Sequence, residues 1–248
     1  MRVVSTETAH LKARDTPAEG LRERKKRLMR QQLSDTATRM FVERGFAAVR
    51  VSEVAEVCGV SEKTVFNYFP TKESLVLDRL ETTMADLRTG LADTRVPPVQ
   101  AALQILDREL SGMTAWLSAQ DDADQAAQAF RRFGDLIRAT PSLRAYQSDM
   151  MDQLVSAATE ILAARTGMRA DDPEPQIAAR AVLALWRVQA ESLRKHLGSY
   201  EPAQVHEMVT AEVRRAARLI DTGLRSFASR TPDGGARGRG SDRSGREH

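Results

Sequence analysis

The chain has 248 residues and a formal net charge of +3, and 42% of its residues are hydrophobic and 29% charged. This composition supplies apolar surface for one or two folded domains and excludes disorder along the whole length. No apolar run is long enough for a membrane span or a signal peptide, so we expect a cytoplasmic protein. The single cysteine, Cys58, excludes an intrachain disulfide framework and a multi-cysteine zinc site. No catalytic motif is present, so we expect no enzyme, no metal and no cofactor.

The two ends of the chain differ in composition from the part between them. Residues 1–20 read as a flexible lead. Residues 229–248 are rich in Gly, Arg and Ser and contain no large apolar residue, so they predict a disordered basic tail. Six basic residues then cluster near the start of the first expected helix: Arg22, Arg24, Lys25, Lys26, Arg27 and Arg30. Such a cluster is either a solvated helix face or an arm that neutralises phosphates, and it does not by itself decide between the two.

The pattern between the two ends is helical throughout. A first helix is expected over about 21–44, with Gly45 as its left-handed stop. A short helix follows from Ser52, whose hydroxyl can cap it, to about residue 58. A glycine turn at Gly59 leads to a second short helix over 62–69, which Ser61 caps.

Pro70 ends that helix, because proline has no amide hydrogen and restricts the residue before it. Thr71 is expected to cap a fourth helix that runs to about Thr94. Amphipathic spacing then predicts five more helices, over about 98–119, 122–139, 142–167, 174–197 and 202–228. The sequence therefore predicts an all-α protein of about nine helices, with an N-terminal domain over 22–84 and a C-terminal domain over 85–228.

The two short helices have the pattern of a helix-turn-helix. Small and apolar residues form the expected inner faces: Val54, Ala55, Cys58, Val60, Val65 and Phe69. The expected outward face of the second helix holds Glu62, Lys63, Thr64, Phe66, Asn67 and Tyr68. Two aromatic rings beside a lysine and an asparagine suit insertion into a DNA major groove better than a purely solvated surface.

The segment from about Arg24 to Met84 resembles the DNA-binding domain of the TetR family of transcriptional regulators. Three stretches carry the resemblance: Phe41 to Phe46, Val54 to Ser61, and above all Thr64 to Leu75 with its Thr-Val-Phe-Asn-Tyr-Phe-Pro-Thr-Lys-Glu-Ser-Leu run. The chain departs from a commoner family pattern in having Lys at 63 and Phe at 66. The C-terminal part resembles the family only in its all-helical layout and length.

The resemblance implies a role for each residue of this surface. Ser52 would contact a phosphate, and Thr64, Tyr68 and Lys72 would hold the DNA backbone. Base edges would be read by Lys63 at guanine, Glu62 at a cytosine amino group and Asn67 at adenine, with Phe66 on a thymine methyl. The implied partner is a double-stranded DNA operator.

Large side chains in the C-terminal part are either core or the lining of a ligand site. They are Trp116, Phe130, Phe133, Tyr146, Met150 and Trp186. A pocket for a small-molecule ligand between helices would be mostly apolar, and the resemblance implies a hydrophobic small-molecule effector. It also implies a homodimer that forms through the last two helices. We expect the interface to be a stripe of small and branched residues: Ala178, Ala181, Leu185, Val209, Val213, Ala216, Ala217 and Ile220.

Three functions remain open at this point. The first is a dimeric repressor released from a palindromic operator by a ligand. The second is an effector-independent regulator whose C-terminal domain only dimerises or binds a protein. The third is an enzyme with a vestigial helix-turn-helix, for which the sequence offers no catalytic constellation.

Overall fold

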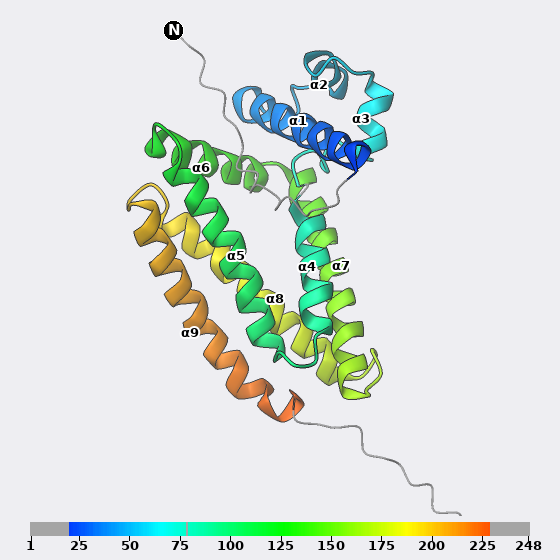
Figure 1. The fold of residues 1–248 in the computed structure, drawn as a ribbon, viewed down its shortest axis with the longest axis vertical. Coiled ribbons are helices and arrows are strands. Elements are labelled where there is room, and N and C mark those ends of the chain that lie inside the picture. The colour runs from blue at the N-terminus through cyan, green and yellow to red at the C-terminus, as the bar shows by residue number, and fades with distance from the viewer. Residues whose placement is uncertain (1–19, 78, 229–248) are drawn as a thin grey trace, which may run out of the picture.

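A computed structural model describes residues 20–77 and 79–228 of the chain (Figure 1). These residues form nine helices and no strand, which confirms the all-α prediction. The helices are α1 (Leu21–Arg44), α2 (Val51–Val57), α3 (Glu62–Tyr68), α4 (Arg79–Ala92), α5 (Pro98–Ser118), α6 (Ala123–Ala139), α7 (Pro141–Thr166), α8 (Pro173–His196) and α9 (Pro202–Ala228). None of the helices in these residues is long and apolar enough to cross a membrane. The expected lead and tail lie outside the described residues, apart from Gly20.

Helices α1 to α3 gather at one end of the molecule, and α4 leads from them into the bundle of α5, α7, α8 and α9 (Figure 1). Helix α1 buries one face at 3–4 spacing, where Leu33, Ala37 and Phe41 have no exposed surface. Helix α1 ends at Gly45 as expected, and the φ of this residue, 87°, is one that glycine readily adopts. Its ψ of 148° differs from that of the left-handed helical conformation that we expected at this stop.

The helix-turn-helix forms where the sequence predicts it, with one difference in how its first helix is capped. Helix α2 begins at Val51, so Ser52 is not its cap, and the Arg50 amide donates instead to Glu53 Oε2 at 2.7 Å. Gly59 has a φ of 67°, and a Cβ built there would meet no atom within 4 Å. Glycine is therefore favoured by the backbone conformation of the turn, not by a close approach of the two helices.

The prediction that the fourth helix starts after Thr71 is wrong, because α4 begins at Arg79. Thr71 and Ser74 instead close a separate turn on each other. The Ser74 amide donates to Thr71 Oγ1 at 3.1 Å, and the Thr71 amide donates to Ser74 Oγ at 3.2 Å. The side-chain hydrogen bond expected of a helix cap is therefore present, but it closes this local turn and does not begin a helix.

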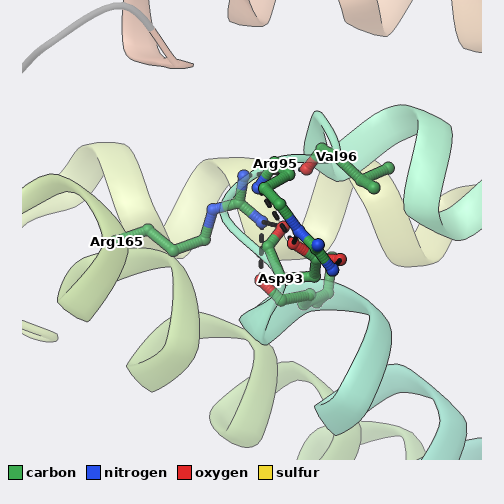
Figure 2. Close-up of polar contacts among 5 residues, drawn as sticks. Asp93, Arg95, Val96 and Arg165 are labelled. Atoms are coloured by element: carbon green, nitrogen blue, oxygen red, sulfur yellow. Dashed lines mark hydrogen bonds and ion pairs between the residues drawn. The ribbon is translucent and has the colours of Figure 1, made fainter.

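Helix α4 is held from two sides along its length. Leu87 and Leu91 are fully buried where α4 packs against α5 and α7. At its C-terminal end, Arg165 of α7 donates to the carbonyl groups of Leu91 at 2.6 Å, Asp93 at 3.1 Å and Val96 at 2.9 Å (Figure 2). One guanidinium thereby binds two carbonyl groups at the end of the helix and one in the loop that follows it.

The core beneath α1 to α3 extends into the C-terminal helices. Leu143, at the start of α7, is fully buried in the same cluster as Phe41 and Phe69. Partly buried side chains of α6 pack against this cluster: Phe133, Leu136 and Ile137. The two predicted domains therefore share a hydrophobic core, in addition to their covalent link through α4.

The stripe expected to face a second subunit lies mainly inside the protomer. Leu185, Val209, Val213 and Ala217 are buried in one core cluster with α5 residues, and Ala178 is buried in another. A second face of the same helices is more open to solvent. It holds Ile177, Ala181, Ala184 and Val188 on α8, and Ala216, Leu219, Ile220 and Gly223 on α9. We call this set the α8–α9 outer face.

Candidate DNA-binding surface

Helix α3 is anchored by two fully buried side chains, Val65 and Phe69. Its first turn is capped as predicted, because Ser61 Oγ accepts the Thr64 amide at 3.1 Å. At its other end, Arg30 of α1 donates to the Tyr68 carbonyl at 2.9 Å and lies 4.7 Å from the centre of the Phe69 ring. These contacts fix the rotation of a helix of only seven residues.

All four side chains predicted to contact bases are exposed on one face of α3. Glu62, Lys63, Phe66 and Asn67 occupy positions i, i+1, i+4 and i+5, so they project to the same side. The Phe66 ring is 43% exposed, which is a large apolar surface for a side chain without a partner. This face presents a cation, a carboxylate, an amide and an aromatic ring together.

The residues expected to hold the DNA backbone differ in how exposed their side chains are. Ser52 is exposed near the start of α2. Thr64 is half-buried, with Oγ1 2.8 Å from Ser61 Oγ, and the Tyr68 ring packs partly against the core.

Lys72 points inward in this structure. Its Nζ donates to the Phe46 carbonyl at 2.5 Å and lies 4.4 Å and 5.4 Å from the ring centres of Phe46 and Phe41. Burial lowers the pKa of this ammonium group, and the nearby Glu73 and Glu53 oppose that shift. An ammonium group has three donors, so the Phe46 contact leaves two of them for a phosphate.

We expect Lys72→Met to lower the stability of the protein by about 1–2 kcal/mol, because it removes a charge-assisted hydrogen bond and a cation–π contact. Urea unfolding measures this loss. The matched control is Lys63→Met, which removes the same group from an exposed site and should leave stability unchanged. Equal stability of the Lys72 variant and the wild type would show that the ammonium group does not hold the domain together.

The six residues expected around a ligand do not meet in one cluster. Trp116, Phe130 and Trp186 border a cluster formed mainly by α5, α6, α8 and α9 residues, whereas Phe133 borders the N-terminal core. Tyr146 and Met150 are half-buried on α7. The Trp186 indole donates to Glu109 Oε2 at 3.1 Å, and Thr83 of α4 donates to Glu109 Oε1 at 2.8 Å.

One side-chain group has the composition of a hydrolytic triad without its geometry. Ser111 Oγ lies 3.1 Å from His206 Nε2, and Asp107 Oδ1 lies 3.7 Å from the same nitrogen. A Ser-His-Asp triad uses opposite ring nitrogens for serine and aspartate. The group therefore links α5 to α9 and does not form a nucleophile–base pair with an orienting acid.

Three positioning residues could not be found from the sequence: Arg30, Glu109 and Arg165. The sequence grouped Arg30 with its basic neighbours, and only the fold shows that it locks α1 to α3. Glu109 and Arg165 act on segments 26 and at least 69 residues away. No local pattern marks such long-range partners.

Comparison with known proteins matches both parts of the chain. The family model described as bacterial regulatory proteins, tetR family, matches residues 33–78, and the model of the MftR C-terminal domain matches residues 113–224. The regulator TcmR of Streptomyces glaucescens is 30% identical over 181 residues, covering 68% of this chain and 74% of that protein. The putative mycofactocin biosynthesis regulator MftR of Mycobacterium tuberculosis is 26% identical over 175 residues, covering 67% and 84%. Among solved structures, the Thermus thermophilus TetR-family repressor FadR, in complex with lauroyl-CoA, is 21% identical with a TM-score of 0.46, covering 79% of this chain and 94% of that one.

A helix-turn-helix followed by an all-helical C-terminal part is the arrangement of a DNA-binding transcriptional regulator. The chain belongs to the TetR family of transcriptional regulators.

Proposed function

We propose that this regulator is a dimeric repressor that reads a palindromic operator with α3 and leaves it when a hydrophobic small molecule binds the C-terminal helices. The observation that carries the proposal is the exposed face of α3, with Lys63, Phe66 and Asn67 held outward by the buried Val65 and Phe69. Those side chains match the hydrogen-bonding and methyl groups of the major groove.

Selection of binding sites from a randomised DNA duplex pool tests the reading of bases. We expect Lys63→Ala and Asn67→Ala each to weaken binding to the selected duplex by about 1–3 kcal/mol and to relax the preference at one base position. The control Arg88→Ala removes an exposed charge from α4 and should keep the preference. If the Lys63 variant keeps full discrimination, the proposed orientation of α3 on DNA is wrong.

A homodimer is proposed because one short recognition helix reads too few base pairs to define a unique site. The α8–α9 outer face supports this, since Ile177 is 63% and Leu219 79% exposed on a face that also holds three alanines and a glycine. Small side chains allow two helix pairs to approach closely, and the exposed apolar residues would be covered by a partner.

We expect Leu219→Arg to give a monomer, because it places two charges at the centre of the proposed interface. Light scattering should fall from about twice 27.5 kDa to 27.5 kDa. The control is Ala203→Arg, on the opposite side of α9, which should remain dimeric. A wild-type mass of 27.5 kDa at all concentrations would contradict the homodimer.

Release by a ligand is proposed through two connections between the C-terminal helices and α3. The first is α4, which Arg165 and Glu109 tie to α7, α5 and α8. The second is the core that Leu143 and α6 share with α1 to α3. A ligand that favours a different arrangement of these helices would change the separation of two recognition helices, which must stay near 34–36 Å or a multiple of it.

The coupling must be reciprocal if the ligand acts on DNA binding. An effect of about 1–3 kcal/mol on the operator requires an equal effect of the operator on the ligand. A thermal-shift screen with hydrophobic metabolites would identify a ligand, whose affinity is then measured with and without saturating operator. Equal affinities would favour the second candidate, a regulator whose C-terminal domain only dimerises or binds a protein.

A further inference from the structure

We propose that the first two turns of α1 form a second DNA contact, in which Arg22 and Lys26 bind phosphates beyond the bases that α3 reads. This inference rests on the proposed DNA-binding function. It assigns a partner to the basic cluster, which the sequence left open between a solvated face and a phosphate-binding arm.

Most of the basic cluster is exposed, and few acidic residues lie near it in the sequence. Between positions 20 and 34 the chain has six basic residues and one acidic residue, Glu23, for a net charge of +5. The first four basic side chains are exposed, and none of them forms an ion pair within the described residues: Arg22, Arg24, Lys25 and Lys26. Cations that have no ion-pair partner among the described residues can bind an external anion.

The basic residues in the first turns of α1 do not stabilise the helix. Cations in the first turns oppose the helix dipole, which favours acidic groups there. Arg22 and Lys26 also repel each other at i and i+4. The N-cap, Gly20, provides no side-chain hydrogen bond. A local arrangement that weakens a helix is expected at a functional site.

The fold aims part of the cluster toward the recognition helix. Arg30 faces α3, because its guanidinium holds the Tyr68 carbonyl and the Phe69 ring. With 3.6 residues per turn, Lys26 is turned about 40° and Arg22 about 80° from Arg30 around the axis of α1. Arg24 and Lys25 are turned farther from Arg30, by about 120° and 140°. Figure 1 shows the N-terminal, dark-blue end of α1 beside α3.

The reach of this contact follows from helix geometry. At about 1.5 Å per residue, Arg22 lies about 12 Å along α1 from Arg30. Phosphates on one strand follow each other at about 3.4 Å along the axis, so 12 Å corresponds to about three or four nucleotides. The contact would extend each half-site by that length without reading its sequence.

The test compares two double variants of one helix that remove the same charge. R22Q/K26Q removes two charges from the side of α1 nearer to α3. R24Q/K25Q is the control and removes two charges from the rest of the helix surface. Each protein is titrated onto a duplex selected by the wild type, from 50 to 200 mM salt, and the bound duplex is footprinted with hydroxyl radicals.

We expect R22Q/K26Q to reduce the slope of log K against log salt by about 1.8 per protomer, since each phosphate contact contributes about 0.9. Protection of about three or four nucleotides at the outer edge of each half-site should disappear, and the base preference should stay unchanged. R24Q/K25Q should keep that protection and most of the slope.

Equal slopes and footprints for the two double variants would overturn the inference and leave the proposed function intact. If the wild type selects no duplex at all, the proposed function fails and the inference fails with it. Circular dichroism checks that α1 is retained, and removing the charges of Arg22 and Lys26 should favour the helix.

Discussion

Phe69→Ala should unfold the DNA-binding helices at lower urea concentration, with a loss of about 3–5 kcal/mol. The ring is fully buried in the core with Phe41 and Val65, and Arg30 lies over its face. Removing it leaves a cavity beneath α3 and takes away one of the two side chains that hold that helix in place. DNA binding should be lost with it, because the outward residues no longer share one fixed face.

The matched control for this prediction is Phe66→Ala, because Phe66 lies on α3 three residues before Phe69, which directly follows the helix. The Phe66 ring is 43% exposed, so its removal should change stability by less than about 0.5 kcal/mol. It should nevertheless weaken binding to a selected duplex, since the ring is available to a thymine methyl group. Equal losses of stability in the two variants would contradict the assignment of inner and outer faces.

Leu143→Ala should destabilise α1 to α3 by about 2–5 kcal/mol, although Leu143 is 75 or more positions beyond all of these helices. Its side chain is fully buried in the N-terminal core. The shared core therefore predicts a loss of stability in the DNA-binding helices from a change in α7. Native-state hydrogen exchange of the α1 to α3 amides measures this effect locally.

Leu154→Ala is the control for that experiment, because it makes the same change on the same helix. Leu154 is buried in a different cluster, with α4, α5 and α8 residues. Its loss should raise exchange mainly in those helices. If Leu143→Ala leaves exchange in α1 to α3 unchanged, the two parts of the chain do not share a core in solution.

Local signals in the sequence were sufficient for much of the fold. The 3–4 spacing of apolar residues predicted nine helices, and most of their ends lie within two residues of the expected positions. Ser61 capped α3 as expected because the cap depends on one hydroxyl and one amide three residues apart. The inner and outer faces of α3 also followed from spacing, since Val65 and Phe69 are buried and Lys63 and Asn67 are exposed.

Two expectations proved wrong because a local sequence pattern does not show which larger structural element it belongs to. Thr71 has the pattern of a helix cap, but Ser74 returns the hydrogen bond and closes a separate turn. The stripe through Val209 and Val213 has the pattern of an interface, but α5 already covers it. An apolar stripe shows that a face is buried and does not show by what.

The sequence by itself determined the helical class, the helix-turn-helix and the side chains that α3 turns outward, because each depends on contacts between residues a few positions apart. Only the tertiary structure decided that Lys72 lies against Phe46, that Arg165 holds the end of α4, and that Leu143 completes the core beneath α3. These contacts join residues 26 to about 100 positions apart, and their partners are chosen by how the helices pack. Helical periodicity specifies the face of each helix, whereas packing selects the neighbour that covers it.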